Sequence, residues 1–286
     1  MSDFSNYQSG EALYGLADNL LPEIADSIGF SLAERPEVSN ISELISVVGP
    51  DKELQKNISV VREVLGEDAK DQIADWIERS GIMYPVERGL VSPVAVPDSV
   101  DTVIINGGVA NWMLRRTAVV QRLDPEKVGQ VVLPIGNRTM ANVEHQLVAS
   151  YEKKFGQRPT ESQFAERYLL GSLALMGFDA QLIAVESGRG NEVLDALVAT
   201  NPSTLDGTVV VASNAPNAIQ AAGELRLAGQ RSRANFDSAG EQVFMVSDSF
   251  PVARHGEAAK THQNPETALG QLFRNAYFLV KNGVVI

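Results

Sequence analysis

The sequence has no cysteine, only three histidines and no long hydrophobic run. Without cysteine the chain forms no disulfide, thiolate zinc site or cysteine nucleophile, a composition that suits the reducing cytoplasm. No stretch approaches the roughly 20 apolar residues of a membrane-spanning helix. The first 15 residues have neither the basic region nor the apolar region of a secretory signal. We therefore expect a cytoplasmic protein without a membrane association.

Basic charge is also scarce, and its shortage is uneven along the chain. The net charge is −12; residues 1–100 hold 18 acidic and 7 basic residues, whereas residues 101–286 hold 18 and 17. An acidic surface repels phosphate backbones, so we expect no nucleic-acid binding. The acidic N-terminal third leaves one alternative open, a non-enzymatic interaction protein that docks a basic partner through residues 1–82.

Residues 1–99 differ in pattern from the rest of the chain. Apolar residues recur at helical spacing from Leu13 to Ile28 and again from Leu54 to Leu65, so residues 1–82 are predicted to be an acidic helical region packed on the main domain. Residues 83–99 contain Pro85, Pro93 and Pro97, which predict a linker or an extended wrap rather than a helix.

From residue 100 to residue 286, short apolar runs alternate with helical segments. The runs predicted as strands are Val103–Ile105, Val131–Leu133, Leu182–Val185, Val209–Val211 and Val243–Val246. The segments predicted as helices include Ala141–Lys154, Glu161–Met176, Asn191–Val198, Ala215–Leu227 and a last one over residues 265–280. Continuous runs rich in β-branched residues are typical of parallel strands buried on both faces. The alternation predicts an α/β domain with a three-layer, doubly wound, mainly parallel sheet, that is, a Rossmann-like fold.

The first predicted strand ends in a glycine pair that could approach a ligand. Asn106-Gly107-Gly108 precedes a helix that carries Arg115, and the helix N–H groups and the arginine favour an anionic group. The sequence here is neither GxGxxG nor a Walker motif, so the common dinucleotide and nucleoside-triphosphate modes are not supported. A tight turn without a ligand is the alternative interpretation.

Polar residues also follow the other predicted strands. Glu161 begins a helix behind Thr160, Glu186 follows the third strand with Asn191 beyond it, and Ser213-Asn214 ends the fourth. Because parallel strands bring their carboxyl ends to one edge of a sheet, these residues are expected to converge on one pocket. Glu161 and Glu186 would be its acid–base groups, and Gly107, Gly108, Arg115, Asn191, Ser213 and Asn214 would hold the ligand. Helix caps and solvated loops are the alternative interpretations.

No histidine stands at i, i+4 from another metal ligand, so we expect no metal. A metal-dependent hydrolase that uses Glu161, Glu186 and His262 ranks below the other hypotheses, because the sequence shows no ligand spacing for it.

The polar residues that follow the predicted strands, taken in chain order, resemble the motifs of the bacterial domain-of-unknown-function family that includes the YdcF, SanA and ElyC proteins. Gly107-Gly108 with Arg115 or Arg116, Thr160-Glu161-Ser162, Glu186-Ser187 with Asn191-Glu192, and Ala212-Ser213-Asn214 with Gln220 resemble its successive motifs. The resemblance covers roughly residues 100–250. It implies a Rossmann-like fold with a ligand cleft, and S-adenosylmethionine binding, which is associated with YdcF-like members.

The chain departs from that family in the last motif. Pro216 and Asn217 stand where the family has a histidine, and Gln220 stands near its arginine. The leading hypothesis is thus a cytosolic protein that binds a small nucleotide-like or S-adenosylmethionine-like molecule at the carboxyl ends of its strands. Whether it is an enzyme, which ligand it takes and which oligomer it forms are left open by the sequence.

Overall fold

The computed structural model describes residues 22, 25, 31–39, 43, 71, 74, 85–90, 94–186, 190–232 and 243–249. Most of the predicted acidic helical region over residues 1–82 lies outside the described residues, as does the helix predicted over residues 265–280; a 3₁₀ turn at Leu32–Glu34 is described within the former. No helix in the described segments is long and apolar enough to cross a membrane.

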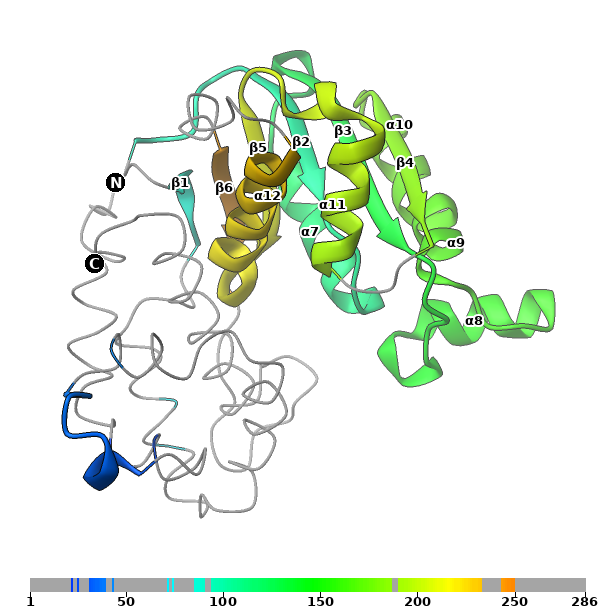
Figure 1. The fold of residues 1–286 in the computed structure, drawn as a ribbon. Coiled ribbons are helices and arrows are strands. Elements are labelled where there is room, and N and C mark those ends of the chain that lie inside the picture. The colour runs from blue at the N-terminus through cyan, green and yellow to red at the C-terminus, as the bar shows by residue number, and fades with distance from the viewer. Residues whose placement is uncertain are drawn as a thin grey trace. The chain divides into compact units, whose positions relative to one another are not determined.

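Six described strands form one sheet (Figure 1). They are β1 (Glu87–Gly89), β2 (Val100–Ile105), β3 (Val128–Gly136), β4 (Ala180–Val185), β5 (Val209–Asn214) and β6 (Val243–Asp248). Their order across the sheet is β1-β6-β5-β2-β3-β4. Strands β2 to β6 are parallel to their neighbours, and β1 pairs antiparallel with β6. Each strand predicted in this part of the sequence is present.

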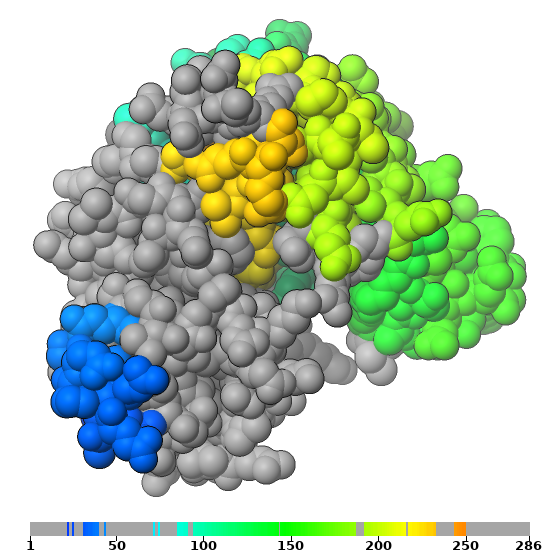
Figure 2. Space-filling view, viewed as in Figure 1, coloured from blue at the N-terminus to red at the C-terminus, as the bar shows by residue number. Residues whose placement is uncertain are grey.

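Helices connect the parallel strands. They are α7 (Ala110–Val120), α8 (Gln146–Phe155), α9 (Glu161–Ala165), α10 (Gly171–Leu175), α11 (Gly190–Thr200) and α12 (Ala218–Ser232). A π-helical turn, Glu166–Leu170, joins α9 to α10. Short 3₁₀ turns lie at Pro125–Lys127, Asn142–Glu144, Pro202–Leu205 and Ala215–Asn217. Helices α11 and α12 lie in front of the sheet and α7 behind it in Figure 1, and the space-filling view shows α11 and α12 as the surface on the front side (Figure 2). This arrangement confirms the predicted α/β, mainly parallel fold.

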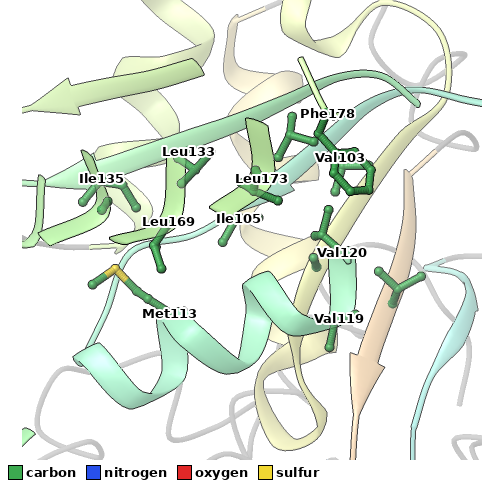
Figure 3. Packing of buried hydrophobic residues seen from close by; sticks show 14 of the residues in the cluster. Val103, Ile105, Met113, Val119, Val120, Leu133, Ile135, Leu169, Leu173 and Phe178 are labelled. Atoms are coloured by element: carbon green, nitrogen blue, oxygen red, sulfur yellow. The ribbon is translucent and has the colours of Figure 1, made fainter. Parts of the chain in front are cut away.

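One core lies between the sheet and α7. Met113, Val119 and Val120 of α7 belong to the same cluster of buried side chains as Val103 of β2 and Leu133 of β3 (Figure 3). All five are at most 2% exposed, and burying an aliphatic side chain of this size contributes about 1.5–3 kcal/mol. Leu169 and Leu173, from the π turn and α10, belong to the same core, so these helices share the face of the sheet that α7 covers.

One part of the strand prediction is wrong. The apolar run in β4 predicts burial on both faces, but β4 is the edge strand beyond β3, and Ala184 is exposed while Leu182 and Ile183 are half-buried. An edge strand has a neighbouring strand on one side only, so its side chains are less buried. An apolar run therefore indicates that a segment is a strand, but not how deeply the strand is buried.

The chain divides into two compact units. One consists of residues 85–214 and 221–248 and contains the whole described sheet; the other consists of residues 1–84, 215–220 and 249–286. Within the Pro-containing segment predicted over residues 83–99, Glu87–Gly89 forms β1, and Arg88 bridges to Ala95.

Candidate functional site

The order of the strands reverses between β2 and β5. From β2 the chain proceeds to β3 and β4 on one side, then returns to β5 and β6 on the other. Open α/β sheets bind ligands at the carboxyl ends of the strands at such a switch point. Here those ends carry Asn106-Gly107-Gly108, which connects β2 to α7, and Ser213-Asn214, which closes β5. We refer to residues 106–108 as the glycine turn.

Both glycines of the glycine turn lie close to charged side chains. A Cβ on Gly107 would lie 3.2 Å from Oε2 of Glu161. Gly108 has φ = +149°, which side chains rarely allow, and a Cβ there would lie 3.5 Å from Nη1 of Arg116. The turn is therefore enclosed by a carboxylate on one side and a guanidinium on the other.

Arg116 joins the two sides of the switch point. Its Nη1 donates to the carbonyl oxygens of Asn106 (2.8 Å) and Gly107 (2.6 Å), and its Nε donates to Oδ1 of Asn214 (3.3 Å). Only 5% of Arg116 is exposed, and this burial lowers its pKa to about 10, although nearby acids such as Glu224 and Glu161 oppose the shift. Arg116 is still charged at neutral pH and fixes the glycine turn to the end of β5.

Arg138 and two glutamates, Glu144 and Glu161, form a second cluster beside the turn. Nε of Arg138 donates to Oε1 of Glu161 (2.7 Å), while its Nη1 and Nη2 donate to the two carboxylate oxygens of Glu144 (2.8 and 3.3 Å). The backbone brings them together, because Glu161 N donates to Arg138 O (2.9 Å). Thr160 caps α9 as the sequence predicts, since its Oγ1 accepts from Gln163 N.

The pKa values of the two glutamates are shifted in opposite directions. Burial raises the pKa of Glu161, and the opposing effect of Arg138 does not cancel this. Burial also acts to raise the pKa of Glu144, but hydrogen bonds from Arg138 and from the N–H groups of Ala141 and Ala110 outweigh it, so the pKa of Glu144 is lowered. Neighbouring acids whose pKa values are driven apart are a recurring arrangement in sites that perform acid–base chemistry.

Buried polar atoms without partners surround the switch point. Within the described residues, Oδ1 of Asn106, Oγ of Ser213 and Nδ2 of Asn214 make no hydrogen bond. Each such atom costs about 1–3 kcal/mol. Native structures keep few of them, and a bound molecule or water is a usual explanation. The π-helical turn behind Glu161 is a further feature common at functional sites.

The structure brings together four of the residues that the sequence predicts for the site. Gly107, Gly108 and Glu161 meet at the glycine turn, and Arg116 connects Asn214 to the same place. Ser213 precedes Asn214 at the end of β5, and because side chains alternate along a strand it points to the opposite face of the sheet.

Arg115 is not part of this group, because its Nη2 pairs with Oδ2 of Asp248 at the end of β6 (2.6 Å). Successive residues on a helix are about 100° apart, so only one of two adjacent arginines can face the turn, and that residue is Arg116.

Glu186 and Asn191 stand away from the glycine turn. Glu186 follows β4 at the same edge of the sheet, but β3 lies between β4 and β2, and the carboxyl side chain is exposed. Asn191 lies in the first turn of α11, and its side chain is outside the described structure. Their assignment to the site remains a prediction.

Sequence reasoning missed Arg138 and Glu144 as site residues. Arg138 lies two residues beyond β3, where the rule of strand ends could have found it. Glu144 lies in the long connection between β3 and α9, where no periodicity or motif identifies it. The described residues hold no group of three or more His, Asp or Glu side chains placed to bind a metal, and His262 lies outside them.

Comparison of the chain with protein-family models, with curated proteins and with solved structures gives no match.

Proposed function

We propose that this protein binds a small nucleotide-like or S-adenosylmethionine-like molecule at the switch point, over the glycine turn. The observation that carries the proposal is the set of buried, unpartnered atoms there, on Asn106, Ser213 and Asn214. An amide oxygen, a hydroxyl and an amide nitrogen offer both acceptors and donors, which complements a ligand rich in nitrogen and oxygen.

Two further features support this site. The glycine turn carries no side chain beyond Asn106, so no Cβ of its own glycines separates the backbone from a ligand. Arg116 holds the turn and the end of β5 in one rigid arrangement, which lowers the entropic cost of binding. The resemblance to YdcF-like proteins implies a ligand of the same kind, and the absence of cysteine leads us to place this activity in the cytoplasm.

Glu161 is the group we assign to proton transfer, if the bound molecule is also turned over. Glu161 is only 5% exposed, burial raises its pKa, and its Oε2 adjoins Gly107. A carboxylate with a raised pKa is a stronger base than an exposed one, so Glu161 can accept a proton from a ligand. Glu186 is the second carboxylate of the proposal, at the end of β4.

Binding should be tested on the full chain by thermal shift and equilibrium dialysis against nucleosides, nucleotides and S-adenosylmethionine. A ligand at a hundredfold excess over its Kd stabilises the protein by about 2.7 kcal/mol. For the ligand that binds, Ser213→Ala should weaken affinity at least tenfold, because it removes an atom that only the ligand satisfies.

Thr204→Val is the matched control. Thr204 also has a buried hydroxyl without a partner among the described residues, but it precedes β5 at the opposite edge of the sheet. Its substitution should leave affinity unchanged. Absence of any thermal shift across the panel, or equal effects of Ser213→Ala and Thr204→Val on affinity, would contradict the proposal.

A further inference from the structure

The N-terminus of α7 already holds an anion that belongs to the protein. Oε2 of Glu144 accepts a hydrogen bond from the N–H of Ala110, the first residue of this 11-residue helix, at 3.1 Å. The same carboxylate accepts from Ala141 N (2.9 Å) and from both Nη atoms of Arg138. Four donors thus surround the Glu144 carboxylate, and its side chain is only 7% exposed.

In folds of this kind, that position is where a phosphate binds. The first N–H groups of a helix point outward without intrahelical partners, and the helix dipole favours negative charge there. A carboxylate with two oxygens offers the same charge and the same acceptors as one face of a phosphate. In this protein the internal carboxylate satisfies the N–H of Ala110, so a phosphate could bind there only by displacing it.

The segment that carries Glu144 is anchored at both ends. Residues 140–159 follow β3, and the two ends of this segment are joined where Met140 N donates to Pro159 O (3.0 Å). Within the segment, Nδ2 of Asn142 donates to Oε2 of Glu152 on α8. Glu144 therefore occupies its position as part of a built loop and not as a free surface side chain.

The other charged side chains beside the glycine turn, Arg116 and Glu161, offer no alternative site for an anion. Arg116 directs Nη1 at backbone carbonyls beneath the turn. Glu161, 95% buried, places Oε2 at the glycine turn, and among the described residues no donor contacts that oxygen. A ligand at this point meets an acceptor, and an additional negative charge would be repelled.

We infer that Glu144 closes the N-terminus of α7 to phosphate, so that the ligand of this site presents an uncharged or cationic hydrogen-bond donor, such as a hydroxyl or an amine, to the glycine turn. Glu144 is then a specificity-determining residue that excludes phosphorylated ligands from this end of the site. The statement about the ligand rests on the proposed function, whereas the closure of α7 is independent of it.

Inorganic phosphate tests the closure on the full chain without any assumption about the ligand. The amide signal of Ala110 is followed by NMR in the wild type, in Glu144→Ala and in Glu126→Ala. Glu126→Ala is the control, because it changes the net charge by the same amount as Glu144→Ala. Glu126 is exposed in the 3₁₀ turn before β3, at the opposite edge of the sheet from Ala110. Phosphate should shift the Ala110 signal in Glu144→Ala with an affinity at least tenfold higher than in the wild type and in Glu126→Ala.

A phosphate-induced shift of Ala110 in the wild type as large as in Glu144→Ala would overturn the closure, and so would no gain in Glu144→Ala. If Glu144→Ala does not fold, Glu144→Ser, whose short uncharged side chain removes the carboxylate from Ala110 N, replaces it, with the same expectation. Adenosine and AMP then test the ligand class: the ratio of adenosine affinity to AMP affinity should fall at least tenfold in the Glu144 variant. An unchanged ratio would overturn the class assignment. A phosphate gain without binding of adenosine, AMP or any other member of the panel would support the closure and contradict the proposed function.

Discussion

Polar side chains at the amino ends of the parallel strands (the amino edge) and at their carboxyl ends (the carboxyl edge) differ in their hydrogen bonding. At the amino edge the polar groups are paired across the strands: Asp101 accepts from Thr208 N (2.7 Å), Gln130 donates to Thr102 (3.0 Å), and Gln181 donates to Gln130 (2.7 Å). At the carboxyl edge, Asn106, Ser213 and Asn214 have buried atoms without described partners. Thr204 is an exception at the amino edge.

This contrast separates structure from function. Side chains that pair with one another stabilise the register of the sheet, and no further molecule is needed to explain them. Buried groups that lack partners reduce stability, so their concentration at one edge indicates a role other than holding the fold together. Substitutions at the amino edge should change stability alone, and substitutions at the carboxyl edge should change binding.

The largest expected effect on stability is at the amino edge. A Cβ on Gly129 of β3 would lie 2.6 Å from the backbone oxygen of Asp101, and backbone cannot move aside as a side chain can. We expect Gly129→Ala to lower the free energy of unfolding by about 3 kcal/mol, measured by urea denaturation, with ligand affinity of the folded protein unchanged. Gly171→Ala is the control, because a Cβ there has nothing within 4 Å and the residue is helical, so it should stabilise slightly. Equal stabilities of the two variants would contradict the close approach at Gly129.

At the carboxyl edge, Arg116→Met should have the next largest effect. Methionine fills similar space but donates nothing, so the carbonyls of Asn106 and Gly107 and the amide of Asn214 lose their donor. We expect a loss of about 2 kcal/mol together with a loss of binding. Arg115→Met is the matched variant, since Arg115 pairs with Asp248 instead. Unchanged affinity in Arg116→Met would remove the link between the switch point and the ligand.

The glutamates beside the turn should respond to pH in opposite directions. The pKa of Glu144 is lowered in the folded protein, so its contribution is present above its ordinary value of 4.5 and is lost as the pH falls through the folded pKa. The pKa of Glu161 is raised, so the folded state holds this proton more tightly and stability falls as the pH rises from 4.5 through the folded pKa.

Glu144→Gln should therefore reduce the free energy of unfolding by about 1 kcal/mol at pH 7, and this difference from the wild type should shrink in acid. Glu161→Gln should be no less stable than the wild type at pH 7. Urea denaturation of the three proteins from pH 7 down to about pH 3, below the ordinary pKa of a glutamate, measures both effects. Equal losses at pH 7 in the two variants would contradict the assigned electrostatics.

The smallest effect on stability is expected at the end of β4. Glu186 is exposed, so Glu186→Gln should change the free energy of unfolding by less than about 0.5 kcal/mol. A fall in ligand affinity in this variant would extend the site across β3 to the edge of the sheet. Unchanged affinity would confine the site to the switch point.

Much of the fold could be predicted from the sequence because parallel strands and their helices leave local signals. The apolar runs identified β2 to β6, and Thr160 marked the start of α9. The depth of each strand left no such signal: β4 at the edge is as apolar as β5 in the interior, because its composition does not record how many neighbours it has.

The location of the site could be predicted from the sequence, but the contacts between its side chains could not. Strand ends identified the glycine turn, Glu161 and Asn214, because topology alone brings them to one edge. Whether Arg115 or Arg116 faces the glycine turn depends on which face of α7 packs on the sheet. Two adjacent arginines in the sequence do not indicate that face. Glu144 reaches Ala110 from 34 residues along the chain through a loop without regular pattern, and such a contact is set by the fold as a whole.

The pairing of β1 with β6 has a consequence for the timing of synthesis. Gly89 pairs with Phe244, roughly 150 residues later in the chain. A ribosome that adds 5–20 residues per second needs roughly 8–30 s to cover that distance. During this interval the segment of β1 has emerged while its partner strand has not yet been made. Pro85 and Pro97 flank the segment and disfavour helical backbone at the residues that precede them. The antiparallel border of the sheet can therefore form only after β6, the last of the six described strands, has been synthesised.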